Sequence, residues 1–141
     1  MKRKIYFAAP LHDHDDQRRN AAAVQLLRDE GYEVYLPQEH GVWEDLLSQF
    51  GGDATKTRQY LYTMDLHAMQ QADCCVAYVN RDKGPSEGML WEMGYMAGCN
   101  KPVFLLNPAY KHRYNLMPQF GSCMFDSMTA LLDHLNKEDF K

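Results

Sequence analysis

The chain has 141 residues, of which 45% are hydrophobic and 24% charged, as is usual for water-soluble globular proteins. This length fits one compact core, and we predict a single domain over residues 1–141. The net charge of −4 argues against nucleic-acid binding through backbone phosphates, and no apolar run approaches the length of a membrane span. We therefore expect a cytoplasmic protein that binds neither nucleic acid nor membranes.

The N-terminal segment 1–7 starts with basic residues, but its apolar part is too short for a signal peptide. The cysteines Cys74, Cys75, Cys99 and Cys123 include no C-x-x-C pair, and we expect them to be reduced and mostly buried. Segment 12–16, His-Asp-His-Asp-Asp, contains metal-binding residue types, but a solvated loop and an acidic first helical turn explain it better. No metal is therefore expected at these residues.

Strands and helices alternate along the chain. Ala21, Val24 and Leu27 recur on one helical stripe, and Gly31 suits the end of that helix. The predicted strands are 4–8, 32–36, 74–79, 101–106 and 122–125. The predicted helices are 13–30, 55–71, 86–98 and 127–135, with one or two helical turns at 42–47 and a loop after residue 106. This alternation predicts right-handed crossovers and a parallel sheet with helices on both faces.

Sheets of this kind bind ligands at the carboxyl ends of their strands. The loops 9–16, 80–86 and 107–118 leave such ends and are the expected walls of a site. Neither G-x-G-x-x-G after the first strand nor a P-loop is present. A dinucleotide or a nucleoside triphosphate is therefore not the default ligand.

Two carboxylates stand in apolar surroundings. Glu92 is alone in the otherwise uncharged stretch 88–98, where burial is costly unless the carboxylate is paired or functional. Asp65 lies within the apolar helical stripe formed by positions 61, 64, 68, 69 and 72. The alternative for each is an exposed helix face. Two acids in apolar settings beside one strand can instead divide the roles of nucleophile and acid.

Three further polar residues have a structural interpretation beside any functional one. Ser86 suits a helix N-cap, or its hydroxyl contacts a sugar or phosphate at the helix start. Tyr6 is near the carboxyl end of the first strand, where it either packs or orients a carboxylate. Asn115 lies in a loop, where an amide can simply shape a turn.

At these residues the chain resembles the nucleoside 2-deoxyribosyltransferases. Lys4–Pro10 is similar to their first strand, K-I-Y-x-A-G-P, and Asp65-Leu66 precedes Ala72-Asp73 as it does in the family. Gly88–Ala97 is similar to their G-x-x-x-E-[ILM]-G-Y-A helix, and Asn115-Leu116-Met117 to their N-L-M. The resemblance spans roughly residues 4 to 135, and the glutamate helix together with N-L-M is its specific part.

The resemblance implies a flavodoxin-like or Rossmann-like three-layer α/β sandwich with a five-stranded parallel sheet. It implies that Glu92 is the nucleophile that forms a covalent deoxyribosyl-enzyme, that Asp65 is the acid for the departing base, and that Tyr6 holds the nucleophile. The implied partners are a nucleoside or nucleotide, a free nucleobase and further copies of the chain, and the resemblance implies no metal or organic cofactor. The family forms homodimers or larger homo-oligomers with shared active sites, in which Asn115 reaches the neighbouring site.

The residues that the resemblance assigns to substrate binding are Ser86, Gly88, Asn115, Met117, Pro10 and His12. Many transferases have Asp where Ser86 stands, whereas the related deoxynucleoside 5′-monophosphate N-glycosidases often have Ser there for the phosphate. Those hydrolases tend to have Ser and Arg where Pro10 and His12 stand, and Ser in place of Asn115. We therefore predict a transferase first and a monophosphate hydrolase second, with a non-catalytic nucleotide sensor as the alternative from another class.

Overall fold

The computed structural model describes residues 2–79, 83–106 and 116–139. Its strands are β1 (Lys4–Ala8), β2 (Glu33–Tyr35), β3 (Cys74–Tyr78), β4 (Val103–Leu106) and β5 (Cys123–Phe125). Its helices are α1 (His14–Asp29), the 3-10 turn η1 (Pro37–Glu39), α2 (Trp43–Gln49), α3 (Ala54–Gln71), α4 (Glu87–Gly98), α5 (Leu116–Phe120) and α6 (Met128–Asp139). None of the helices in these ranges is both long and apolar enough to cross a membrane.

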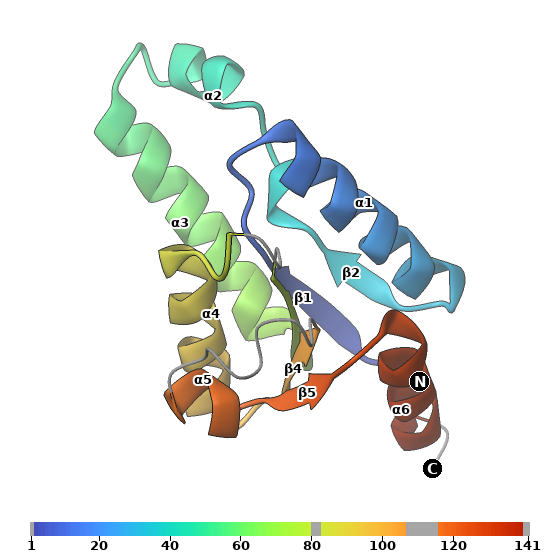
Figure 1. The fold of residues 1–141 in the computed structure, drawn as a ribbon. Coiled ribbons are helices and arrows are strands. Elements are labelled where there is room, and N and C mark those ends of the chain that lie inside the picture. Colours follow the sequence, from blue (N-terminus) through green and yellow to red (C-terminus); the bar gives the residue numbers. More distant parts are fainter. Residues whose placement is uncertain (1, 80–82, 107–115, 140–141) are drawn as a thin grey trace.

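The strands pair in parallel as one five-stranded sheet in the order β2-β1-β3-β4-β5. Helices cover both faces of this sheet, with α1 and α6 on one face and α3 and α4 on the other (Figure 1). The predicted three-layer sandwich is confirmed. The strand order is the flavodoxin-like one, in which the crossovers change sides between β1 and β3.

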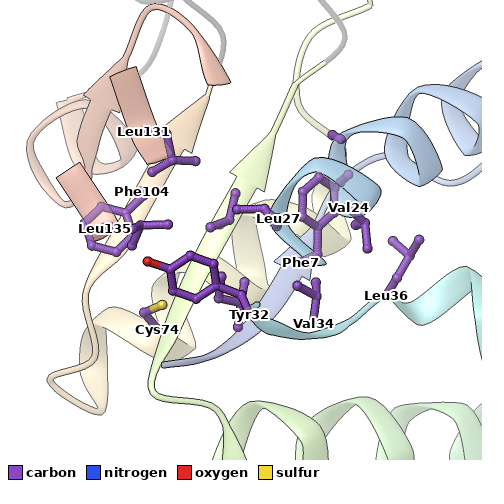
Figure 2. Packing of buried hydrophobic residues seen from close by; sticks show 14 residues of the cluster. Phe7, Val24, Leu27, Tyr32, Val34, Leu36, Cys74, Phe104, Leu131 and Leu135 are labelled. Atoms are coloured by element: carbon purple, nitrogen blue, oxygen red, sulfur yellow. The ribbon is translucent and has the colours of Figure 1, made fainter. Parts of the chain in front are cut away.

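Each face of the sheet has its own apolar core, because successive strand residues point to opposite faces. Ile5 and Phe7 of β1 join the core beneath α1 and α6, whereas Tyr6 and Ala8 join the core beneath α3 and α4. Figure 2 shows the first of these cores, where side chains of α1, α6 and the central strands meet. Burial of this apolar surface holds the helices against the sheet.

The structure contains every predicted strand and helix, and it adds the two short elements η1 and α5. Two of the differences from the prediction involve proline. β4 begins at Val103 and not at Lys101, because Pro102 has no N–H group to donate to a ladder. The loop predicted after residue 106 contains α5, with Pro118 at its third position. The first turn of a helix needs no N–H donors from its own residues, so proline is tolerated there.

The cysteines are free, but the expectation that most are buried is wrong for two of the four. Cys74 and Cys75 are fully buried in the central strand β3, whereas Cys99 and Cys123 are exposed. Cys99 is the C-cap of α4, and Cys123 opens the edge strand β5. Helix ends and sheet edges have fewer neighbours than a central strand, so burial there depends on what packs over them.

Candidate active site

A cavity of about 450 Å³ lies at the carboxyl ends of β1 and β2, beside the start of α4. Its lining comes from the segment after β1, the start of η1, α3 and the first half of α4. The residues are Ala9, Leu11, His12, Pro37, Tyr62, Asp65, Met69, Ser86, Gly88, Met89, Trp91 and Glu92. The cavity therefore lies beside β1 and β3, at the switch point where open α/β sheets bind their ligands.

Tyr6 and Glu92 form the central contact of the site. The hydroxyl of Tyr6, whose side chain is fully buried, donates a hydrogen bond to Oε2 of Glu92. Burial, followed by the nearby charges of Glu92 and Asp65, raises the pKa of Tyr6 far above its ordinary value. Tyr6 therefore keeps its proton near neutral pH and acts only as a donor toward the carboxylate.

Burial also perturbs the carboxylate itself. Removal of water raises the pKa of Glu92 from its usual 4.5 to about 7, the Tyr6 hydrogen bond opposes this rise, and the charge of Asp65 adds to it. The carboxylate is therefore poorly solvated and, near neutral pH, divided between its two protonation states. Perturbed groups of this kind in a cavity are typical of functional sites.

Asp65 is the second carboxylate of the cavity, and it has its own tyrosine. The hydroxyl of Tyr35 on β2 donates a hydrogen bond of 3.0 Å to Oδ1 of Asp65 on α3. Burial raises the pKa of Asp65, while this hydrogen bond and the charge of His40 oppose the rise. Both carboxylates thus face one cavity and resist ionisation, which suits an acid and a nucleophile.

The start of α4 gives the cavity a polar wall. Ser86 is the N-cap of α4, and its Oγ accepts a hydrogen bond of 3.3 Å from the N–H of Met89. Ser86 and Gly88 both line the cavity, and a Cβ placed on Gly88 would meet no other side chain within 4 Å. The capping interpretation of Ser86 is confirmed, and its hydroxyl is also placed where a ligand can reach it.

Three amide side chains hold the segment after β1 in place. Asn20, which is buried, donates through Nδ2 to the carbonyl of Pro10 at 2.9 Å and to Oε1 of Gln38 at 3.1 Å. Gln38 in turn donates to the carbonyl of Gln17 at 2.7 Å, and Gln17 donates to that of Leu11 at 3.0 Å. These bonds satisfy the backbone carbonyls of Pro10, Leu11 and Gln17 and fix the wall that Leu11 contributes to the cavity.

The other predicted binding residues lie in different places. His12 lines the cavity, but Pro10 lines a separate small pocket next to Asn20. Met117 is 71% exposed on α5 and does not line the cavity of this single chain. Asn115 lies outside the described residues. The roles assigned to these residues by resemblance stay predictions.

The acidic and histidine-rich segment 12–16 forms the start of α1. Asp13 is the N-cap, and its Oδ1 accepts a hydrogen bond of 2.8 Å from the N–H of Asp16. Asp13 also pairs with Lys83, Asp15 with Arg18, and Asp16 with Arg19. In residues 2–79, 83–106 and 116–139 no group of three or more His, Cys, Asp or Glu side chains is arranged to hold a metal ion.

Sequence reasoning missed an aromatic wall and the support of Asp65. Tyr62 and Trp91 line the cavity with ring centroids 6.0 Å apart and an angle of 66° between their planes. The available signal was spacing, since Tyr62 precedes Asp65 by one helical turn and Trp91 directly precedes Glu92. No sequence signal linked Tyr35 to Asp65, because the two belong to different elements.

This fold and site define an open parallel α/β protein with a ligand cavity that holds two desolvated carboxylates. The profile of the nucleoside 2-deoxyribosyltransferase family matches residues 5–133. The chain therefore belongs to the nucleoside 2-deoxyribosyltransferase family, and the suspected family is confirmed. The match covers most of the first strand, both carboxylates and the first half of α6.

Individual relatives agree with this assignment. The chain is 32% identical over 103 residues to the 5-hydroxymethyl-dUMP N-hydrolase of Rattus norvegicus, a match that covers 72% of this chain and 59% of that relative. It is also similar to the solved structure of a 2-deoxyribosyltransferase from Bacillus psychrosaccharolyticus, with a TM-score of 0.71, 26% identity, and coverage of 91% and 89% of the two chains. A conserved protein from Enterococcus faecalis V583 shares the fold, with a TM-score of 0.72, 22% identity, and coverage of 98% and 99%.

The raised pKa of Glu92 predicts a stability cost that depends on pH. As the pH rises from 4.5 toward 7, the unfolded chain loses the Glu92 proton while the folded chain retains it, so the wild type loses stability. Glu92→Gln has no such proton to lose. The free energy of unfolding of Glu92→Gln minus that of the wild type should therefore be about 2 kcal/mol larger at pH 8 than at pH 5, which means that the variant gains stability relative to the wild type.

Urea denaturation at the two pH values measures this difference. Glu87→Gln is the matched control, because Glu87 is an exposed glutamate on the same helix. Equal pH dependence of the wild type and Glu92→Gln would contradict the buried, desolvated state of this carboxylate.

Proposed function

We propose that the protein cleaves the N-glycosidic bond of 2′-deoxynucleosides through a covalent intermediate on Glu92 and transfers the sugar to another nucleobase. One observation carries this proposal: Glu92, oriented by Tyr6, and Asp65 face the same cavity. A carboxylate nucleophile and a separate acid are the groups that two-step glycoside chemistry requires. Membership of the deoxyribosyltransferase family supports the choice of sugar and bond.

In the first step, an oxygen of ionised Glu92 attacks the anomeric carbon of the sugar. The bond from that carbon to the base nitrogen breaks, and its electron pair goes to the base. Asp65 provides a proton to the base, because a neutral leaving group departs more readily than an anion. The hydrogen bond from Tyr6 keeps one carboxylate oxygen of Glu92 fixed, so that the other is the attacking atom.

In the second step, a nitrogen of an incoming base attacks the same carbon and releases Glu92. Asp65, now ionised, accepts the proton that the incoming base loses, which restores the starting state. Two displacements at one carbon retain the configuration of the sugar. The aromatic rings of Tyr62 and Trp91 at the cavity wall offer flat surfaces for either base.

The second candidate function is hydrolysis of a 2′-deoxynucleoside 5′-monophosphate, with water as the acceptor. Two observations favour it: a relative that is 32% identical is a 5-hydroxymethyl-dUMP N-hydrolase, and Ser86 and His12 both line the cavity. Ser86 caps α4, and the N–H groups at a helix start favour an anion. Both functions use the same first step and differ only in the acceptor and in the 5′ group.

We further propose that the active protein is a homo-oligomer in which α4 and α5 face a second copy. Large apolar side chains are exposed on these helices, namely Leu90, Trp91, Leu116, Met117 and Phe120. Exposed apolar side chains that gather on one part of a protein surface mark interaction sites. The resemblance, which implies that Asn115 reaches the site of a neighbouring subunit, supports such an arrangement.

The product of the reaction separates the two candidate functions. Incubation with 2′-deoxyinosine or thymidine plus free adenine should produce a new deoxynucleoside, detected by chromatography.

Glu92→Ala tests the nucleophile. This variant should keep the fold but lose turnover, because the attacking carboxylate is absent, whereas the control variant Glu87→Ala should retain turnover. Intact mass should show a deoxyribosyl adduct on the wild type alone. Near-normal turnover by Glu92→Ala would remove Glu92 from this role, and release of free base only from a monophosphate would favour the hydrolase.

Asp65→Asn tests the acid. The variant should lower kcat by about 10²-fold, because loss of general acid catalysis has effects of that size. The loss should be smallest for bases that leave easily, since these need the proton least. Steady-state rates over nucleosides with different bases measure this trend. Asp133→Asn, an exposed aspartate on α6, is the control, and an equal loss for every base would contradict the acid role.

The oligomer has a direct test. Light scattering after gel filtration should give at least twice the chain mass of 16.4 kDa. Phe120→Asp should lower the mass to that of one chain and reduce turnover, because it places a charge in the proposed interface. Leu26→Asp is the matched control, since Leu26 is 49% exposed on α1, on the opposite face of the sheet. A wild-type protein that is active as a single chain would contradict the proposal.

A further inference from the structure

Three aromatic rings form a stack behind the two carboxylates. The ring centroids of Tyr6 and Tyr35 are 5.6 Å apart with 14° between the planes, and those of Tyr35 and His40 are 4.1 Å apart with 6° between them. The rings come from β1, β2 and the residue that ends η1. Near-parallel packing of this kind restricts the rotation of each ring, so the stack joins three separate segments into one rigid unit.

Each tyrosine of the stack holds one carboxylate. Tyr6 donates to Glu92, and Tyr35 donates to Oδ1 of Asp65 at 3.0 Å. The stack therefore sets the position of the two carboxylates relative to each other, although they lie on different helices. Tyr35 does not line the cavity, so it reaches the ligand only through Asp65.

We propose that Tyr35 is a positioning residue for the acid of the reaction, with the ring of His40 as its support. This inference rests on the proposed function. The Tyr35 hydroxyl occupies Oδ1 of Asp65 and leaves Oδ2 to carry the proton that passes to the base. The proton of Tyr35 stays on Tyr35 throughout, and the electron pair of the broken bond goes to the base nitrogen.

The charges around the pair define what loss of the hydroxyl does. The titratable groups that interact with Asp65 are Tyr35 of β2, His40 after η1, Tyr6 of β1 and Glu92 of α4, and Tyr60 of α3 interacts with Tyr35. Burial raises the pKa of Tyr35, as does its position beside Asp65, so the hydroxyl remains a donor. Its hydrogen bond opposes the rise in the pKa of Asp65, and removal of the hydroxyl raises that pKa further.

Tyr35→Phe tests the proposal because it keeps the ring and its stacking but removes the hydroxyl. We expect kcat to fall about tenfold for bases that leave poorly, with a smaller change in KM, since a hydrogen bond to a charged group has effects of that size. The alkaline limb of the pH–rate profile should move to higher pH, because Asp65 holds its proton longer. Tyr32→Phe is the matched control: its hydroxyl donates to Asn136 at 2.8 Å in the core on the other face of the sheet.

A titration of the Asp65 carboxyl carbon by NMR gives a readout that is independent of turnover. In Tyr35→Phe the midpoint should move to higher pH than in the wild type, and in Tyr32→Phe it should not move. If Tyr35→Phe does not fold, His40→Ala serves as the second variant, because it removes the supporting ring and a charge that opposes the rise in the pKa of Asp65. The midpoint of the Asp65 titration should move to higher pH in this variant too.

The possible failures are distinguishable. A wild-type protein that cleaves deoxynucleosides, with a folded Tyr35→Phe variant that has unchanged kcat and an unshifted alkaline limb, would overturn the role of Tyr35 alone. A wild-type protein that cleaves none of the nucleosides or monophosphates would overturn the proposed function. In that case an unshifted Asp65 titration in Tyr35→Phe would overturn the positioning role as well.

Discussion

The hydrogen bond from Tyr6 to Glu92 is the interaction on which the rest of the site depends. A carboxylate that points from a helix toward the sheet loses much of its hydration, and it is tolerated there only with a partner that remains a donor. A fully buried tyrosine on the central part of the sheet meets this need, because burial raises its pKa and prevents it from ionising. The result is a carboxylate that is fixed in direction yet weakly solvated.

Weak solvation makes the Glu92 carboxylate more reactive, and it also lowers the stability of the folded protein when that carboxylate is ionised. A desolvated carboxylate is a better nucleophile than a hydrated one, but the same desolvation opposes its ionisation in the folded protein. The second carboxylate, Asp65, lies within electrostatic range of Glu92 and has a tyrosine of its own. Two acids with separate donors can hold different protonation states in one cavity, which is the condition for dividing the roles of acid and nucleophile.

The walls of the cavity are of two kinds, and they have different origins. The wall after β1 is held by hydrogen bonds from buried amides, as with Asn20 on the carbonyl of Pro10, so its shape is set within one chain. The wall at Trp91 belongs to α4, which contacts α5, and both helices carry exposed apolar side chains such as Phe120, which is 80% exposed. Exposure of these apolar side chains to water is unfavourable, and this is the physical basis for proposing that a second copy covers them.

The sequence by itself determined the element types, the parallel three-layer fold and the two carboxylates, because strand and helix periods and an isolated charge among apolar residues are local properties. The family resemblance implied that Tyr6 holds Glu92, but no local pattern showed this contact, and only the tertiary structure paired Tyr35 with Asp65. Tyr6 and Glu92 are 86 positions apart, and Tyr35 and Asp65 are 30 apart. Contacts of this range follow from strand register and crossover geometry, which bring β1, β2, α3 and α4 to one end of the sheet, and no local pattern encodes them.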